Sequence, residues 1–305
     1  MNTQSITIGI PAYNEEANIK YLLKLLLDQK LKNAAIHEVI VVSDGSTDGT
    51  VLQVKSLKDK RIRLIDRKKR LGILKTQNEV LKHSHGDILV LLDADVLPVN
   101  NSFIEELTKP IIVDKSISLV GADTISVAPR TFFEKIITDS HEFKKYIYRK
   151  IRNQNNIYLC HGRARAFSKI FYTHLRWPDS PPEDAYSYLF CINNGYKFAF
   201  APKAKIFFRS PTTFKDHLKQ SYRFFIGMKQ MEKYFSYEFV RNQYHIPKVV
   251  FWGSLFKYLI KKPLTLSMYL LILVYIRLIS LRKNVQKATW DIASSSKKLI
   301  YENTH

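Results

Sequence analysis

Short apolar runs alternate with helical patterns through the first hundred residues, and no other feature constrains the fold as strongly. Strand-like runs rich in Val, Ile or Leu are expected at 5–10, 38–42, 61–65 and 87–92. Between them, apolar residues recur at helical spacing at 18–31, 48–57 and 74–83. Strands that alternate with helices predict an α/β fold with a parallel, doubly wound sheet.

Polar loops follow three of these expected strands. They read PAYNEE at 11–16, SDGSTDGT at 43–50 and DADV at 93–96. In a doubly wound sheet, ligands bind beyond the carboxyl ends of the strands, where such loops gather. The first hundred residues therefore predict a ligand site made from these three loops.

Two carboxylates, Asp93 and Asp95, come directly after the fourth expected strand. Paired carboxylates at a buried strand end are costly unless a cation or hydrogen-bond donors balance them. A hard divalent ion, Mg²⁺ or Mn²⁺, that also binds a diphosphate would provide this balance. The alternative is a helix N-cap with ordinary loop acids, and the D-x-D spacing taken alone favours that alternative.

Other acids carry weaker signals. Asp44 ends the second expected strand and could bond a base or a ribose hydroxyl, whereas Asp48 is better explained as a helix cap. Glu183 and Asp184 follow two prolines, and a positioned carboxylate of this kind can act as a general base. Tandem acids in a loop are more often simply solvated, so the pair is weak evidence by itself.

Basic residues mark two further candidates. Residues 219–224 mix cations with aromatic rings, which suits either a diphosphate clamp and sugar stacking or a surface helix with an aromatic underside. Residues 161–163 form either a turn that faces a ligand or a plain loop. Neither pattern decides between its two interpretations.

The net charge of +21 lies mostly outside the N-terminal third. Residues 1–100 hold 15 basic and 12 acidic side chains, residues 101–240 hold 22 and 13, and residues 241–305 hold 11 and 2. Such a field attracts polyanions of any kind, including nucleic acid, anionic lipid and phosphorylated small molecules. Charge alone does not choose among them.

Residues 264–276 carry no charge and are flanked by Lys and Arg. An amphipathic helix packed on the rest of the chain and a helix that contacts a membrane both fit, and the flanking cations favour the membrane. Residues 1–20 show no secretory signal pattern. Two cysteines without C-x-x-C spacing exclude a disulfide framework and fit a reducing compartment, and an apolar content of 46% excludes wholesale disorder.

Taken in order, PAYNEE, SDGSTDGT, DADV, the ED pair and Q-x-x-R-F resemble the motifs of family 2 inverting glycosyltransferases with the GT-A fold. The resemblance covers residues 5 to about 230. The later part is most similar to processive polysaccharide synthases of the cellulose, hyaluronan and poly-N-acetylglucosamine types. The residues that carry this second likeness are Ala204, Pro211, Thr213, Lys219, Gln220, Arg223 and Gly227.

The resemblance implies roles for fifteen residues. A donor nucleotide-sugar would contact Pro11, Ala12, Tyr13, Glu15, Asp44, Lys75, Asp93, Gln220 and Arg223. Asp95, with Asp93, would hold Mn²⁺ or Mg²⁺, and Asp184 would be the general base with Glu183 beside it. The acceptor side would consist of Gly162, Arg163 and Phe224.

The resemblance also implies an activity. We expect transfer of a hexosyl or N-acetylhexosaminyl unit from a UDP-sugar to a saccharide or lipid-linked acceptor, with inversion, in synthesis of a cell-surface polysaccharide or glycolipid. Phe224 stands where the family has Trp, and the channel-forming spans of the processive synthases are missing, so a single transfer is favoured. The alternative is a non-catalytic basic protein that binds nucleic acid or anionic surfaces on the same scaffold.

The predicted organisation has three parts. Residues 1–100 form the nucleotide-sugar-binding half, 101–235 the acceptor-binding and catalytic half, and 236–305 a basic, apolar helical extension. We expect contact with the cytoplasmic face of the cell membrane through 249–283, either peripheral or by a single C-terminal segment. No nucleic-acid partner is expected, and a homo-oligomer is compatible with the sequence.

Overall fold

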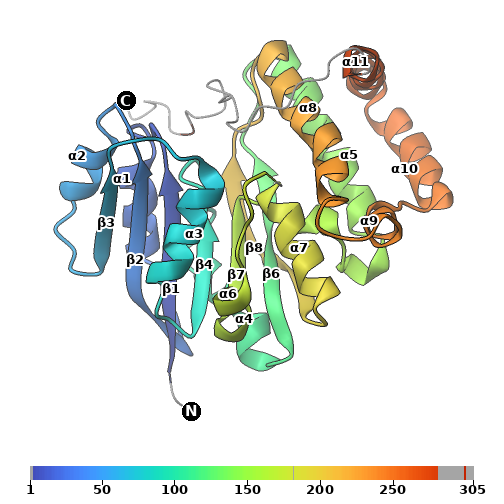
Figure 1. Ribbon diagram of the computed structural model, residues 1–305. Coiled ribbons are helices and arrows are strands. Elements are labelled where there is room, and N and C mark those ends of the chain that lie inside the picture. The colour runs from blue at the N-terminus through green and yellow to red at the C-terminus, as the bar shows by residue number, and fades with distance from the viewer. Residues whose placement is uncertain (1–2, 181, 281–298, 300–305) are drawn as a thin grey trace.

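The computed structural model describes residues 3–180, 182–280 and 299, and its centre is one eight-stranded sheet (Figure 1). Strands β1 to β8 span Gln4–Ala12, Ala34–Asp44, Ile62–Arg67, Ile88–Leu92, Leu97–Pro98, Ile117–Ser126, Ala164–Ser168 and Lys197–Phe208. Helices α1 to α11 span Ile19–Leu27, Thr50–Lys55, Ile73–His83, Phe103–Val113, Phe132–Tyr148, Lys169–His174, Glu183–Asn193, Phe214–Met231, Tyr237–Tyr244, Lys248–Lys261 and Pro263–Ser280. Two short 3₁₀ turns, η1 and η2, span Arg152–Gln154 and Ile157–Leu159.

The strand order is β3-β2-β1-β4-β7-β6-β8-β5. Strands β1 to β4 are parallel to their neighbours in the first half of the sheet, as the sequence predicts. The prediction rests on residues 1–100 alone, and the second half of the sheet is mixed: β7 runs antiparallel to both β4 and β6, β8 runs parallel to β6, and β5 runs antiparallel to β8. Strand β7 lies between β4 and β6 in the sheet although it follows both in the chain, and no local sequence pattern predicts this pairing.

Helices cover both faces of the sheet, as a doubly wound fold requires. On one face, α1, α2 and α4 bury residues such as Leu22, Val54 and Phe103 against the strands. On the other face, α3, α6 and α7 bury a second cluster that includes Val80 and Phe171. The central strands are apolar on both sides for this reason, which explains why they read as continuous apolar runs.

The C-terminal helices form a separate layer beside the second half of the sheet (Figure 1). Helices α10 and α11 pack on α5 through a third apolar cluster that includes Phe143, Leu255 and Leu266. The uncharged run 264–276 lies within α11. No helix in the described ranges has both the length and the apolar character needed to cross a membrane. Residues 281–283 of the expected membrane contact lie outside the described residues.

Several expected elements have different limits in the structure. The strand expected at 38–42 is the longer β2, Ala34–Asp44, and the helix expected at 48–57 is the shorter α2, Thr50–Lys55. The pair Glu183–Asp184, expected in a loop, begins α7. Because strands from 1–100 and 101–235 share one sheet, the boundary near residue 100 separates two halves of one layer, and the three-part division stays a prediction.

Candidate active site

One cavity of about 720 Å³ opens at the carboxyl ends of β1, β2 and β4 and extends to α5, α7 and α8. Fourteen of the fifteen candidate residues line it: Pro11, Ala12, Tyr13, Glu15, Asp44, Lys75, Asp93, Asp95, Gly162, Arg163, Glu183, Asp184, Gln220 and Phe224. The fifteenth, Arg223, lies on α8, and its side chain is outside the described part of the structure. Residues up to 213 positions apart in the chain are thus gathered around one space.

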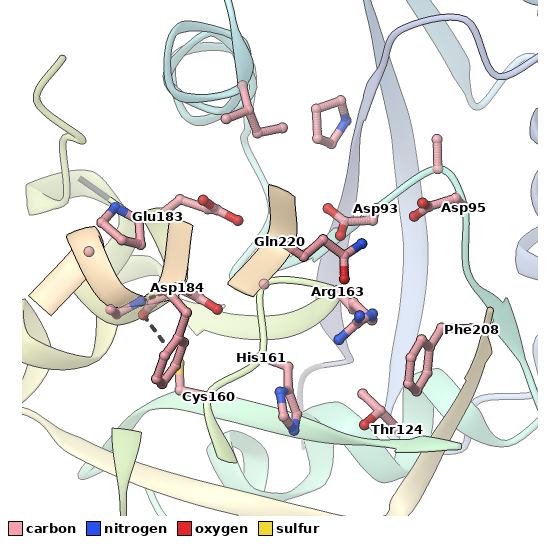
Figure 2. Close-up of a pocket in the computed structure, with 18 of the residues that line it drawn as sticks. Asp93, Asp95, Thr124, Cys160, His161, Arg163, Glu183, Asp184, Phe208 and Gln220 are labelled. Carbon is pink, nitrogen blue, oxygen red and sulfur yellow. Dashed lines mark hydrogen bonds between the residues drawn. The ribbon is translucent and has the colours of Figure 1, made fainter. Parts of the chain in front are cut away.

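Asp93 and Asp95 follow β4 and face the cavity side by side (Figure 2). The backbone N–H of Asp93 donates to the carbonyl of Arg163 at 3.0 Å, which fixes the turn after the strand. Burial, together with the nearby carboxylates of Asp95 and Glu183, raises the pKa of Asp93 to about 8. When all three are ionised, these carboxylates concentrate negative charge in one part of the cavity.

This concentrated negative charge fits a divalent cation. Carboxylate oxygens are the ligands that Mg²⁺ and Mn²⁺ prefer, and a donor diphosphate would supply further oxygens. Within the described residues, no group of three or more His, Cys, Asp or Glu could hold a metal by itself. A cation at Asp93 and Asp95 would take its remaining ligands from a substrate or from water.

Glu183 and Asp184 stand across the cavity from Asp93 and Asp95 (Figure 2). The start of α7, which carries them, is held from behind by two buried residues. Arg165 on β7 donates to the Glu183 carbonyl at 3.1 Å, and Trp177 Nε1 donates to the same oxygen at 2.9 Å. Both also bond the Ser187 hydroxyl one turn later. This support is rigid because Arg165 and Ser187 are fully buried.

Arg165 and Trp177 were not among the residues that the sequence singled out. Their only signal was an arginine inside the buried strand ARAFS and a tryptophan just before the acidic pair. A fully buried arginine is costly unless it is paired. Such a residue near candidate acids is a usable signal once the strand itself has been recognised.

Glycines allow close approaches around this acidic pair. A Cβ on Gly162 would lie 2.7 Å from Glu183 Oε1, so any side chain there would displace the Glu183 carboxylate. A Cβ on Gly227 of α8 would lie 2.6 Å from Pro182 Cγ, so α8 is seated directly on the loop before α7. The positions of α7 and α8 are therefore coupled through contacts that only glycine permits.

Asp44, at the end of β2, is held by partners within the chain. Its two carboxylate oxygens accept the N–H groups of Leu71 and Gly72, each at 2.8 Å, and Arg67 bonds the carboxylate at 3.2 Å. Gly72 adopts a left-handed conformation with φ of +93°, which a side chain would strain. Asp44 thus fixes the loop 67–72 beside the cavity, and its predicted contact with the base stays a prediction.

The loop after β1 is tied to the loop after β2. Thr50 Oγ1 accepts the Glu15 N–H at 2.7 Å, and Asp48 Oδ2 accepts the Glu16 N–H at 3.1 Å. In return, the Glu16 carboxylate accepts the Gly49 N–H at 3.0 Å. The N-cap of α2 is Gly49, and Asp48, one residue before it, accepts the Thr50 N–H at the start of the helix. The two loops therefore form one hydrogen-bonded wall of the cavity.

Aromatic and cationic groups flank that wall. The Arg70 guanidinium lies over the Tyr13 ring, 4.2 Å from its centroid. Lys75 reaches Asp179 at 3.9 Å, but both side chains are mostly exposed, so this ion pair contributes little. Tyr13 and Lys75 line the cavity at its mouth.

The opposite end of the cavity is basic and aromatic. The guanidinium of Arg163 stacks on the Phe208 ring at 4.0 Å and lies near Asp93 (Figure 2). His161 and His141 also line this end, and burial, followed by the nearby cations, lowers the pKa of His161 to about 3 and that of His141 well below its usual range. Both imidazoles are therefore neutral hydrogen-bonding groups at physiological pH.

Helix α8 carries the remaining candidates into the cavity. Gln220 lies between the two acidic pairs in the view of Figure 2. The ring of Phe224 is 58% exposed and lies 6.5 Å from that of Tyr158, so it is open to a ligand on one side. An open aromatic face of this kind suits stacking on a sugar ring.

The sequence is similar to those of known glycosyltransferases. The model of the glycosyl transferase family 2 matches residues 7–175. Dolichyl-phosphate beta-glucosyltransferase ALG5C of Trichomonas vaginalis is 31% identical over 135 residues, which are 42% of this chain and 39% of that protein. Glycosyltransferase GlyA of Streptococcus pneumoniae is 29% identical over 144 residues, 46% of this chain and 20% of the relative. The matched region spans two fifths or less of the length of these curated relatives.

Solved structures show the same fold at low sequence identity. Mannosyltransferase PcManGT from Pyrobaculum calidifontis, in complex with GDP-Man and Mn²⁺, has a TM-score of 0.58 at 18% identity, over 93% of this chain and 76% of that one. The structure of S. aureus TarS 1–349 has a TM-score of 0.53 at 18% identity, over 73% of this chain and 65% of that one. The expected fold class, a GT-A α/β domain with C-terminal helices, is confirmed.

The family match covers more than half of the 305 residues. It includes most of β1, all of β2 to β7, the loops after β1 and β2, and the D-x-D turn. The chain therefore belongs to glycosyl transferase family 2.

Proposed function

We propose that this enzyme moves one hexosyl or N-acetylhexosaminyl unit from a UDP-sugar to a hydroxyl of a saccharide or lipid-linked acceptor, with inversion at the anomeric carbon. The observation that carries the proposal is the shared cavity. Asp93 and Asp95 line one side of it, and Glu183 and Asp184 line the other. An in-line displacement needs the leaving group and the attacking hydroxyl on opposite sides of the sugar, and this arrangement provides for both.

Asp184 is the proposed general base. Its carboxylate faces the cavity from the first turn of α7, where Oδ1 accepts the N–H of Ala185 at 2.7 Å and the second oxygen is left to face a substrate hydroxyl. The backbone of α7 beneath it is fixed by Arg165 and Trp177. A base held this firmly stays at a fixed distance from the acceptor hydroxyl, as proton transfer in the transition state requires.

Asp93 and Asp95 are the proposed ligands of Mn²⁺ or Mg²⁺. When bound, the cation would neutralise the diphosphate leaving group as negative charge develops on it. The chain's own part is to present the two carboxylates at a fixed turn after β4 and to keep Arg163 near Asp93. The donor nucleotide would lie along the wall formed by residues 11–15, with Asp44 and Lys75 beside it.

Helix α8 supports the acceptor side. Gln220 and Phe224 project from it into the cavity, and Gly162 and Arg163 face it from the loop before β7. We propose that the Q-x-x-R-F segment acts as the corresponding segment does in polysaccharide synthases, with Arg223 on the donor phosphates. We assign the enzyme to a single transfer step in the synthesis of a cell-surface polysaccharide or glycolipid. In this proposal, boundaries near residues 100 and 235 divide the chain into a donor half, an acceptor half and an extension.

Calorimetry tests the donor site directly. UDP and GDP are titrated with and without Mn²⁺ into the wild-type chain, into Asp95→Ala, and into Asp28→Asn, a control that changes an exposed acid at the end of α1. We expect metal-dependent binding of UDP in the wild type and the control, and its loss in Asp95→Ala. Equal affinity in all three proteins would contradict the metal assignment. A panel of UDP-sugars, followed by release of UDP, then identifies the donor.

A further inference from the structure

Helix α10 exposes a stripe of large apolar side chains. Val249, Trp252, Phe256 and Ile260 are 85%, 61%, 70% and 69% exposed. Their spacing of three or four residues places them on one face of the helix. The opposite face packs on α5 through buried residues such as Leu255. The stripe is therefore the face that α10 turns away from the protein.

Helix α11 has a stripe of the same kind. Five of its large apolar side chains are between 36% and 70% exposed at helical spacing: Leu264, Met268, Leu271, Tyr275 and Leu278. Its opposite face buries Leu266 and Tyr269 against the same cluster. Only Lys262 separates the two helices, so the end of one stripe, Ile260, is four residues from the start of the other, Leu264. Soluble monomers rarely leave so many large apolar side chains exposed together, and such patches mark interaction surfaces.

The charged side chains of the two helices are all of one sign. Residues 239–280 contain six Lys and Arg and no Asp or Glu. Lys248, Lys257 and Lys261 are exposed on α10, and Arg277 is exposed near the end of α11. A second copy of the same face would bring like charges together, which disfavours a symmetric dimer. An anionic surface with an apolar interior complements both the charge and the apolar stripes.

The surface is continuous with the helix that lines the cavity. The ring of Tyr275 on α11 lies 5.6 Å from that of Phe214 on α8, and both rings are exposed. The same α8 presents Gln220 and Phe224 to the cavity. In Figure 1, α8, α10 and α11 lie on the side of the molecule away from β1, β2 and β3. The exposed apolar face is therefore next to the acceptor side and distant from the donor wall.

We propose that α10 and α11 dock on the surface of a membrane that contains anionic phospholipids. The apolar stripes enter the boundary between headgroups and acyl chains, and the lysines of α10 contact the phosphates. Because the opposite faces of both helices pack against α5, the docking is in the plane of the surface. This proposal stands on the two helices alone and does not depend on the transfer reaction.

Vesicle co-sedimentation of the full chain tests the proposal. Vesicles of phosphatidylcholine are compared with vesicles that also contain phosphatidylglycerol, at low and high salt. The test variant is Trp252→Ser with Phe256→Ser. The matched control is Leu52→Ser with Ile170→Ser, which removes two side chains of similar exposure, 73% and 60%, from α2 and α6.

We expect the wild type and the control to bind anionic vesicles and to release them at high salt. The test variant should bind roughly a hundredfold more weakly, since each large apolar side chain that enters the boundary contributes about tenfold. Changing Lys257 and Lys261 to Gln should weaken binding to anionic vesicles by roughly tenfold or more and leave binding to neutral ones unchanged. UDP affinity without vesicles serves as the folding check for every variant.

Three results would overturn the proposal. One is equal vesicle binding by the test variant and the control. A second is no preference for anionic over neutral vesicles. The third is absence of vesicle binding together with a concentration-dependent dimer that Trp252→Ser with Phe256→Ser abolishes, which would assign the surface to a second copy of the chain. None of these outcomes bears on donor binding, so the two proposals fail separately.

Discussion

The two ends of the cavity are built by different means. At the donor end, consecutive loops after parallel strands bond one another directly, as Asp44 does with Leu71 and Gly72 and as Glu16 does with Gly49. At the acceptor end, β6, α5, α7 and α8 meet around charged side chains and aromatic rings, such as Arg163 on Phe208. The first end is fixed by local hydrogen bonds, and the second depends on distant segments packing correctly.

This difference predicts where substitutions will be felt. A change at the donor end should alter nucleotide binding and the loops around it. A change at the acceptor end should alter turnover, acceptor affinity or the stability of the packed layer, while nucleotide binding persists. A substitution at one end that changes a property assigned to the other end would contradict this division.

Asp184→Asn should have the largest effect on turnover. Loss of a positioned general base reduces the rate by about 10²–10⁴-fold. UDP affinity should stay unchanged, because Asp184 lies across the cavity from the donor wall. Calorimetry and release of UDP from the donor measure the two quantities on the same protein. Near-normal turnover would remove the base assignment, and a parallel loss of UDP binding would mean that the two ends are not separate.

Glu134→Ala should have the largest effect on stability. Glu134 on α5 pairs with Arg209 at 2.8 Å, and the two side chains are 0% and 5% exposed. Its other oxygen accepts the Arg130 N–H at 2.8 Å. Removing the acid leaves a buried cation, which typically costs about 3–5 kcal/mol of unfolding free energy. Urea unfolding measures this loss.

The control for that experiment is Glu142→Gln, which changes an exposed acid on the same helix. It should shift the unfolding free energy by less than about 0.5 kcal/mol. If both variants unfold at the same urea concentration, the ion pair does not hold α5 in place. The acceptor end would then rest on apolar packing alone.

The sequence was most informative where structure is local. The strands and loops of the donor end were predicted because each strand, its polar loop and its helix follow one another in the chain. Asp93 and Asp95 were noted because they directly follow a buried strand, and Asp184 because it belongs to an acidic pair after two prolines, but each signal was weak until the family resemblance joined them. Their convergence on one cavity was expected from the family resemblance, and the structure brings them together.

The acceptor end was harder to predict because its decisive pairings are non-local. Strand β7 carries Arg165 in its interior, and β6 carries Asp123, which is buried only because Lys145 and Arg149 each reach it at 2.8 Å. Charged residues in a strand pattern argue against burial until their partners are known. The antiparallel insertion of β7 and the support from Trp177 could not be read from neighbouring residues.

Asp44→Asn should loosen the donor end. An amide keeps one acceptor oxygen but turns an NH₂ group toward the Leu71 or Gly72 N–H, and the charge that Arg67 meets is lost. Leaving such groups unsatisfied costs about 1–3 kcal/mol. Trypsin should then cut faster after Lys68, Lys69 or Arg70, which are exposed in this loop.

UDP affinity should fall in Asp44→Asn by about tenfold, since each 1.4 kcal/mol is a factor of ten. Asp28→Asn, which changes an exposed acid, is the control for both measurements. An unchanged trypsin pattern with weakened UDP binding would assign Asp44 to the nucleotide itself. An unchanged pattern with unchanged binding would show that the loop is held by other contacts.

Arg163→Lys should have the smallest effect and is the sharpest test of the comparison. Lysine keeps the positive charge near Asp93 but loses the planar stacking on Phe208, at 4.0 Å in the wild type. A cation–π contact of this kind contributes about 1 kcal/mol, which corresponds to roughly a fivefold rise in the KM for the acceptor. Arg163→Gln, which also removes the charge, should raise it further. UDP affinity should not change in either variant. If instead UDP binding weakens while the acceptor KM stays constant, Arg163 contacts the donor diphosphate. Arg163 would then belong to the donor end of the cavity together with Asp93.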